Sequence, residues 1–275
     1  MTTARWPPTI DQRPAPRDST YAGLKAETWD LFEDSGPDAP DRAFFLDLIR
    51  RSGEPVLDVC CGTGRLLLDF LALGIDVDGV DASQAMLDLC RAKAERRGLD
   101  VHLYRQSMER LRLARNYRTV MVASGSFQLL TQPKEARLAM ECLVDALAPG
   151  GTLCLCFMLP PSEDDLADAG PDGWRLSREV RAGDDGLSYR MWSRQRFDRV
   201  NQLEHLENRI EALRDNRVVR SEEFGWTPVT RWYTPDQAIE LMAAAGLVEV
   251  SCAENRVSLP GRSNGRTFFV LGGRD

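Results

Sequence analysis

The sequence lacks the segments that would direct it to a membrane or out of the cell. No run approaches the 18 or so apolar residues that a membrane-spanning helix needs. The first 18 residues, MTTARWPPTIDQRPAPRD, have no apolar core of the kind a signal peptide carries. We therefore expect a cytoplasmic protein that does not associate with membranes.

Metal ligands and disulfide patterns are also scarce. Only two histidines are present, His102 and His205, and no CxxC pair gives a zinc-site spacing. The seven cysteines are an odd number, and Cys60 and Cys61 are adjacent, which favours buried thiols over a disulfide framework. The sequence thus predicts no metal site.

Positive charge is in short supply as well. The chain has 35 basic and 42 acidic residues, a net charge of −7, and only three of the basic residues are lysines. This charge has the wrong sign for a broad grip on a phosphate backbone, so we expect no nucleic-acid partner. The length of 275 residues fits one large domain with an elaboration, or two domains.

What is present is a regular alternation of strands and helices. The apolar pattern predicts strands at 55–60, 75–81, 101–105, 119–124 and 152–157, and helices at 65–73, 83–97 and 133–148. Such alternation with short loops predicts a parallel, doubly wound α/β sheet with helices on both faces. Ligands of these sheets lie at the carboxyl ends of the strands.

The alternation is interrupted once. Residues 1–20 read as a flexible arm, 21–160 as the core with its N-terminal helices, and 232–275 as the return to the same sheet. The segment 161–231 has the polar and apolar alternation of antiparallel strands, and we interpret it as an inserted substrate cap. Four of the six tryptophans lie between Trp174 and Trp232, where they either wall a pocket or form the insertion's own core or a dimer contact.

The most informative run is the glycine loop, VLDVCCGTGRL at 56–66. Gly62 and Gly64 permit a sharp turn from strand to helix and a close approach of ligand to backbone. Asp81 follows 17 residues after Gly64, at the end of the second strand, where a carboxylate can accept hydrogen bonds from ribose hydroxyls. Asp58 is placed for a positively charged amino group, and Leu67 occupies the third glycine position of a dinucleotide fingerprint. The pattern therefore favours a nucleoside cofactor with an amino group over a dinucleotide.

This run resembles motif I of the class I methyltransferases that use S-adenosylmethionine (SAM), whose usual form is VLDxGCGxG. Cys60 stands where that family has glycine. Residues 80–87, 106–109, 148–153, 233–235 and 244–247 are similar to further motifs of the family. The resemblance covers residues 20–160 and 232–252. It implies a Rossmann-like, doubly wound, seven-stranded sheet, here with an antiparallel β insertion as a substrate cap.

The resemblance also implies the cofactor site. Asp81 would hold the ribose, Met86 would flank the adenine, and Ser107 stands where the family often has an aspartate for the adenine amino group. Tyr21 and Trp29 would either close over the cofactor or pack. The full set of expected cofactor-binding residues is Tyr21, Trp29, Asp58, Cys60, Gly62, Gly64, Asp81, Ala82, Met86, Ser107, Met108, Ala123, Ser124 and Phe127.

The acceptor is less directly encoded. The chain has no DPPY or NPPY tetrad, and its charge is negative, so we expect a small-molecule acceptor of the methyl group on nitrogen, oxygen or carbon, with S-adenosylhomocysteine as the product. Residues 123–130 resemble the NSFQHL-like segment of small-molecule methyltransferases related to sugar N-methyltransferases, but Leu129 replaces the histidine. His205 is then the remaining candidate for a catalytic base, or else a surface or packing residue.

Two other functions stay open at this point. A SAM-binding sensor or scaffold without catalysis is compatible with the departures at Cys60 and Ser107. A nicotinamide-dependent oxidoreductase is disfavoured by Leu67 and by the lack of a clear hydride-transfer site. The sequence does not decide between a monomer and a homodimer.

Overall fold

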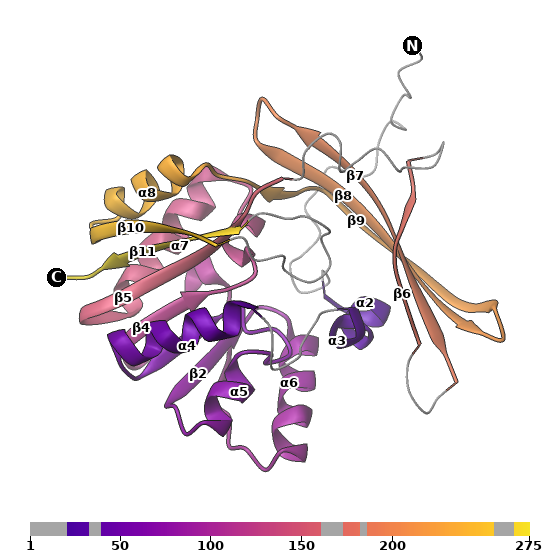
Figure 1. Ribbon diagram of the computed structural model, residues 1–275, viewed down its shortest axis with the longest axis horizontal. Helices are drawn as coiled ribbons and strands as arrows, with labels where there is room; N and C mark the ends of the chain where they lie inside the picture. The colour runs from indigo at the N-terminus through magenta and orange to yellow at the C-terminus, as the bar shows by residue number, and fades with distance from the viewer. Residues whose placement is uncertain (1–20, 33–39, 161–172, 182–185, 256–266) are drawn as a thin grey trace.

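The computed structural model describes residues 21–32, 40–160, 173–181, 186–255 and 267–275, which form two β-sheets with flanking helices (Figure 1). The arm predicted at 1–20 and part of the predicted insertion lie outside the described residues. The α/β fold class, with a mostly parallel seven-stranded sheet and a separate antiparallel sheet, is confirmed. Among the described helices, none combines the length and apolarity that a membrane crossing requires.

The seven-stranded sheet has the strand order β10-β11-β5-β4-β1-β2-β3. Only β11 runs antiparallel to its neighbours; the other pairs in this sheet are parallel. The strands are β1 (Val56–Val59), β2 (Val77–Asp81), β3 (Leu103–Arg105), β4 (Tyr117–Val122), β5 (Leu147–Met158), β10 (Val248–Asn255) and β11 (Thr267–Gly273). Each expected strand is present, with its ends shifted by a few residues.

Helices cover both faces of this sheet. The elements are α4 (Pro40–Ser52), α5 (Leu67–Ala72), α6 (Gln84–Arg96), α7 (Pro133–Ala146) and α8 (Pro235–Ala244), with short 3₁₀ turns η1 (Met108–Arg110) and η2 (Ser126–Leu129). Helices α4, α5 and α6 share one apolar core, and α7 and α8 share the other. The α8 helix begins with a complete capping box, in which Thr234 and Gln237 satisfy each other's backbone amides.

The pleat of the strands divides side chains between these two cores. In β5, Leu153 and Leu155 face α7, while Cys154 and Cys156 face α4 and α5. Both cysteines are fully buried, and burial raises the pKa of each thiol. They are packing residues of the core, as expected.

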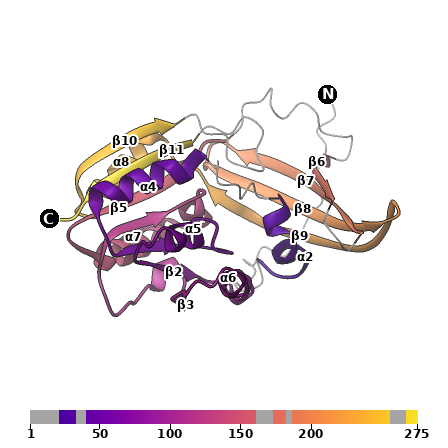
Figure 2. The ribbon, with the colours of Figure 1, turned by 60° about the horizontal axis from the view of Figure 1, so that its bottom comes forward.

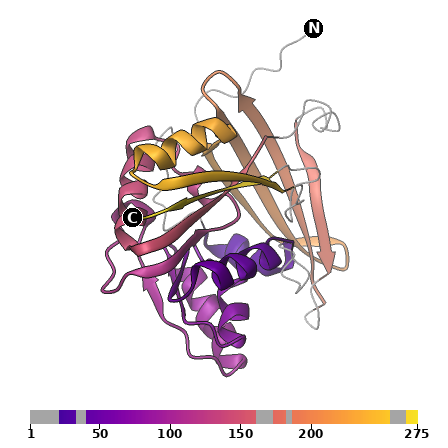
Figure 3. The same ribbon diagram turned by 60° about the vertical axis from the view of Figure 1, so that its left-hand side comes forward.

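The second sheet is a four-stranded antiparallel meander. It consists of β6 (Arg175–Arg181), β7 (Ser188–Asp198), β8 (Leu203–Arg214) and β9 (Arg217–Arg231) in that order. The short helices α2 (Gly23–Glu27) and α3 (Trp29–Phe32) pack on it through Leu24 and Phe32, which contact Ile210 and Ala212. Figures 2 and 3 show this sheet standing beside the seven-stranded sheet, with α2 next to β9.

Candidate functional site

The glycine loop lies where the strand order reverses. The chain runs from β1 to β2 and β3 on one side and continues with β4 and β5 on the other, so the loop after β1 opens at this switch point. Gly62 and Gly64 both have left-handed backbone angles, with φ of 55° and 85°. A Cβ at Gly64 would lie 2.5 Å from the Cys90 sulfur and 2.9 Å from Cγ of Leu68, whereas a Cβ at Gly62 would meet nothing within 4 Å. Gly64 is thus required by packing, and Gly62 borders open space.

Cys60 begins the same loop with a φ of 61°, in the left-handed region that glycine favours. The backbone has kept a conformation suited to glycine although the residue is cysteine. The side chain is half-buried and packs against the core under α7. The departure from the family's sequence pattern therefore leaves the path of the loop intact but introduces backbone strain.

Asp81 links the glycine loop to the end of β2. One of its carboxylate oxygens accepts a hydrogen bond from the Gly62 amide at 3.0 Å, and the other accepts one from the Ser83 amide at 2.8 Å. Burial raises the pKa of Asp81, and the amides oppose this shift. Ser83 caps α6 by accepting from the Met86 amide, and its hydroxyl donates to the carbonyl of Tyr21. The predicted residues Gly62, Asp81 and Tyr21 are thus brought together.

Asp58 is a buried carboxyl group beneath this loop, with 2% of its surface exposed. Burial raises its pKa to about 7; Arg65 lowers the pKa, and the charges of Asp81 and Asp41 raise it further. Arg65 is held by a two-pronged ion pair with Asp41 at 2.7 and 2.6 Å, and it also donates to the Ser124 hydroxyl at 3.3 Å. A ligand with a cationic amino group at this loop would favour the ionised form of Asp58.

The N-terminal helices connect the glycine loop to the antiparallel sheet. Asp30 accepts a hydrogen bond from the Thr63 hydroxyl at 2.6 Å and pairs with the Lys93 ammonium at 2.9 Å. Tyr21 and Trp29 meet edge to face with ring centroids 5.1 Å apart. Glu222 on β9 accepts from the Leu24 amide. The helices therefore lie beside the glycine loop, and Tyr21 and Trp29 pack on one another; whether they contact a cofactor stays a prediction.

The remaining predicted residues are divided between the site and the core. Ser107 follows β3, which is tied to the end of β2 by the bond from the Gln106 amide to the Asp81 carbonyl. Met86 and Met108 are buried, and Ala82 and Ala123 are half-buried. Phe127 is fully buried and packs against Phe157 and Tyr233, which makes it a core residue in this structure.

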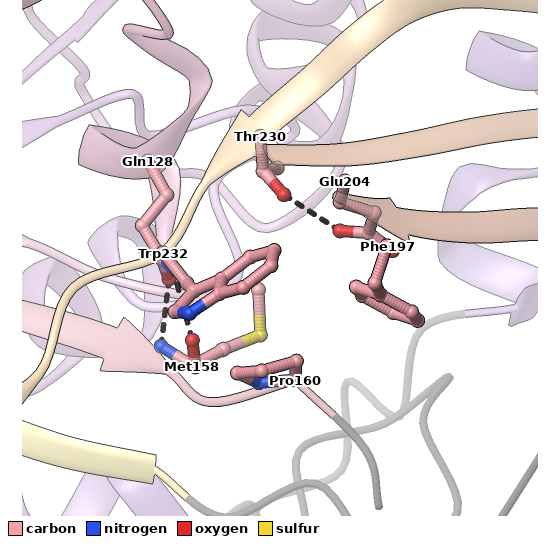
Figure 4. Close-up of a pocket in the computed structure, with 7 residues that line it drawn as sticks. All are labelled: Gln128, Met158, Pro160, Phe197, Glu204, Thr230 and Trp232. Atoms are coloured by element: carbon pink, nitrogen blue, oxygen red, sulfur yellow. Dashed lines mark hydrogen bonds between the residues drawn. The ribbon is translucent and has the colours of Figure 1, made fainter. Parts of the chain in front are cut away.

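A small cavity of about 10 Å³, roughly the space that one water molecule needs, lies between the two sheets (Figure 4). Its lining comes from η2, the ends of β5 and β9, and the facing parts of β7 and β8: Gln128, Met158, Pro160, Phe197, Glu204, Thr230 and Trp232. Glu204 is 2% exposed and accepts a hydrogen bond from the Thr230 hydroxyl at 2.6 Å. The rings of Phe197 and Trp232 meet at 66° with centroids 5.9 Å apart. The cavity thus combines aromatic walls with one carboxylate.

Gln128 fixes one wall of this cavity. Its amide nitrogen donates to the carbonyls of Met158 and Arg231, at 3.0 and 3.2 Å, and its oxygen accepts from the Met158 amide at 2.7 Å. One buried side chain therefore joins the end of β5 in the seven-stranded sheet to the end of β9 in the antiparallel sheet. This contact holds the two sides of the cavity in register.

His205 does not line the cavity. It pairs with Arg196 across β7 and β8, and the alternation of the strand directs it to the opposite face from Glu204. Burial, followed by the charge of Arg196, lowers its pKa. A catalytic role for His205 therefore stays a prediction that the geometry does not support.

Sequence reasoning missed several residues of the site. Arg65 directly follows the glycine loop, and Gln128 lies in the loop after β4. Their positions beside these predicted loops could have identified both residues from the sequence. Glu204 carried none, because its place depends on the register of strands far from any motif. Among the described residues, no group of three or more His, Cys, Asp or Glu side chains is arranged to hold a metal ion.

Known proteins are similar in sequence to the part of the chain that contains the glycine loop. Residues 56–151 match the family described as a methyltransferase domain. The ubiquinone biosynthesis O-methyltransferase of Nitrosococcus oceani is 32% identical over 107 residues, which are 36% of this chain and 42% of that protein. The dTDP-3-amino-3,4,6-trideoxy-alpha-D-glucopyranose N,N-dimethyltransferase of Streptomyces venezuelae is 31% identical over 136 residues, 46% of this chain and 54% of that protein. The matches thus span about half the length of these relatives.

The fold of nearly the whole chain has a solved counterpart. The SAM-bound structure of CalS10, an amino pentose methyltransferase from Micromonospora echinaspora, superimposes with a TM-score of 0.64 at 23% identity. The match covers 91% of this chain and 96% of that chain, so the likeness extends beyond residues 56–151. At this identity the likeness concerns the fold.

Proposed function

We propose, because residues 56–151 match the family described as a methyltransferase domain, that the protein transfers the methyl group of SAM to a small-molecule acceptor. The observation that carries the proposal is the glycine loop at the switch point of the sheet, with Asp81 bonded to the Gly62 amide beside it. The match to the family begins with β1 and includes this loop, β2, α6 and the chain as far as the start of β5.

The residues at the loop fit SAM in their chemistry. Gly62 borders space that a Cβ would enter without contact, so a ligand can approach the backbone there. Asp81 supplies a carboxylate at the end of β2, where ribose hydroxyls can donate to it. Asp58 supplies a buried carboxyl group for the amino group of the methionine part, and its pKa of about 7 allows it to ionise at neutral pH.

SAM, when bound, supplies a methyl group already activated by its sulfonium sulfur. The protein is then left to position the acceptor, to exclude water and to accept a proton where the acceptor carries one. Gln128 would set the distance between the cofactor side and the acceptor side, since it joins β5 to β9. Core packing on both faces of the sheet makes this edge rigid.

We place the acceptor against the antiparallel sheet and interpret residues 161–231 as its cap. The cavity between the sheets supports this assignment, because it opens at the ends of β4 and β5, next to the glycine loop in the strand order. The relatives methylate different atoms: one is named as an O-methyltransferase and the other as an N,N-dimethyltransferase of an amino sugar.

Binding and turnover test the proposal in sequence. Titration calorimetry with SAM, S-adenosylhomocysteine and NAD should show binding of both adenosyl compounds and none of NAD. If neither SAM nor S-adenosylhomocysteine binds, the proposal is refuted. Incubation with SAM and a panel of amines, phenols and sugar nucleotides should then release S-adenosylhomocysteine, which a coupled homocysteine assay detects; binding without turnover on any acceptor would instead favour a SAM sensor.

A further inference from the structure

The middle residue of the glycine loop is held by a side chain from an N-terminal helix. Thr63 lies between Gly62 and Gly64, and its hydroxyl donates a hydrogen bond to Asp30 of α3 at 2.6 Å. Thr63 is 2% exposed, so Asp30 supplies the partner that a buried hydroxyl needs. The two glycines on either side have left-handed backbone angles and wide conformational freedom. The path of the loop between them therefore depends on outside contacts of this kind.

Asp30 is itself fixed from a second side. Its two carboxylate oxygens lie 3.0 and 2.9 Å from the ammonium nitrogen of Lys93 in α6, so the carboxylate stands between a hydroxyl and a positive charge. Hydrogen bonds to an ionised group are shorter and stronger than those between neutral groups. The Asp30 carboxylate is thus oriented by α6 and in turn orients the Thr63 hydroxyl.

The N-terminal segment that carries Asp30 packs on the antiparallel sheet. Phe32 is buried in an apolar cluster on that sheet, and its carbonyl accepts a hydrogen bond from Arg178 of β6. In α2, the Leu24 amide donates to Glu222 of β9 at 2.9 Å. Figures 1 and 2 show α2 between α6 and this sheet. The α2–α3 segment therefore contacts the antiparallel sheet as well as the glycine loop.

We propose that Asp30 is a positioning residue for the cofactor: through Thr63 it holds the glycine loop in the conformation that binds SAM, and it makes this conformation depend on the antiparallel sheet. The inference rests on the proposed function, because the loop is where we place SAM. Asp30 needs no contact with the cofactor in this role. The contact between Leu24 and Glu222 should then influence cofactor affinity, although it involves no residue of the glycine loop.

A double-mutant cycle on S-adenosylhomocysteine affinity tests the link between Asp30 and Thr63. We expect Asp30→Ala and Thr63→Val each to weaken binding about fivefold to tenfold, up to the effect of one hydrogen bond to a charged group. The double variant should lose no more than either single variant, because both substitutions remove the same bond. Titration calorimetry well below the unfolding temperature measures affinity separately from stability. Additive losses, or single variants that bind as wild type does, would overturn the proposal.

Two further variants are the matched controls. Thr63→Ser keeps the hydroxyl and should bind as wild type does. Lys93→Met removes the ion pair of Asp30 but leaves its bond to Thr63, so it should lose less affinity than Asp30→Ala. An equal loss in Lys93→Met and Asp30→Ala would assign the effect to the ion pair and contradict the role of Thr63. If Asp30→Ala fails to fold, Thr63→Val and Thr63→Ser decide the matter, and equal affinities of these two variants contradict the proposal.

A substitution on β9 tests the dependence on the antiparallel sheet. Glu222→Ala removes the acceptor of the Leu24 amide and should lower S-adenosylhomocysteine affinity about twofold to fivefold. Glu223→Ala is the control, because Glu223 is exposed and points to the opposite face of the strand, and it should bind as wild type does. Equal affinities of the two variants would refute the link to the sheet. No binding by wild type refutes the proposed function and this inference with it, whereas wild-type binding that Asp30→Ala leaves unchanged refutes the inference alone.

Discussion

The two sheets build their parts of the site in different ways. On the seven-stranded sheet, the proposed cofactor residues come from short contiguous stretches, at Asp58–Gly64 and Asp81–Met86, that each follow one strand. On the antiparallel sheet, Phe197, Glu204 and Thr230 come from three strands and meet only through pairing. A local motif can therefore specify the proposed cofactor site, whereas the lining of the cavity is specified by the register of the whole antiparallel sheet.

The largest expected effect lies in the cofactor half and concerns Asp58. Its carboxyl pKa is raised in the folded protein from an ordinary 3.8 to about 7, so the folded state holds a proton that the unfolded state has released. Stability should consequently fall as pH rises from about 4 to about 7 and then level off. Asp58→Asn lacks this titration and should gain, relative to wild type, up to about 4 kcal/mol between these limits.

Urea unfolding of both proteins at pH 4, 5.5, 7 and 8 measures this difference directly. Shifts common to both, such as that of Asp81, cancel in the comparison. Parallel stability curves for the two proteins would show that Asp58 titrates normally.

The next effect separates the two glycines of the loop. Gly64→Ala combines left-handed strain with contacts of 2.5 and 2.9 Å and should destabilise the protein by about 3 kcal/mol. Gly62→Ala has only the strain, about 1 kcal/mol, but its methyl group occupies the space proposed for the cofactor. Thermal unfolding should show a larger loss of stability in Gly64→Ala than in Gly62→Ala. The affinity for S-adenosylhomocysteine should nevertheless drop in Gly62→Ala, the more stable of the two variants. Undiminished affinity in Gly62→Ala would show that the cofactor does not bind against the glycine loop.

A substitution of Gln128 tests the contact between the seven-stranded sheet and the antiparallel sheet. Gln128→Ala removes three hydrogen bonds that join β5 to β9 and should lower stability by about 1–3 kcal/mol. It should leave S-adenosylhomocysteine binding within about twofold of wild type, because Gln128 lies outside the glycine loop. A large loss of adenosyl affinity in Gln128→Ala would contradict the placement of the cofactor at the glycine loop.

The smallest effect is expected at Cys60. Its φ of 61° is strained for cysteine, so Cys60→Gly relieves strain while losing some packing and gaining unfolded-state entropy. The net result should be a stability within about 1 kcal/mol of wild type, on the stabilising side. Cys252→Gly, in β10 with no such angle, is the control and should be destabilised instead; equal losses in both variants would argue against strain at Cys60.

The sequence predicted the seven-stranded sheet in more detail than the antiparallel sheet, for a physical reason. Periodicity and turn residues located the strands of the seven-stranded sheet. The glycines, Asp58 and Asp81 were predicted as cofactor residues because a nucleoside-binding turn needs them at fixed spacing. In the antiparallel sheet, neighbouring residues on one strand face opposite sides, so Glu204 lines the cavity while His205, one residue on, does not, and the catalytic role of His205 stays a prediction. Pairing also shifts register between Glu204 and Leu206, which no local signal in the sequence reveals.

Phe127 shows the same limit within the predicted half. It lies in the loop after β4, where both cofactor and acceptor were expected, and its ring is fully buried against Phe157 and Tyr233, so its contact with a cofactor stays a prediction. The preceding Gly125, with a φ of 69°, turns the chain so that Phe127 enters the core and Gln128 reaches β5 and β9. The position of a residue in a loop did not determine which way its side chain points.

The most direct test of the account is calorimetric titration of S-adenosylhomocysteine into wild type, Asp81→Ala and Glu204→Gln. We expect wild type to bind and Asp81→Ala to lose about 10- to 100-fold in affinity, as removal of hydrogen bonds to a charged group predicts. Glu204→Gln should bind as wild type does. Equal affinities for wild type and Asp81→Ala, or a loss in Glu204→Gln as large as that in Asp81→Ala, would contradict the division of the site between the two sheets.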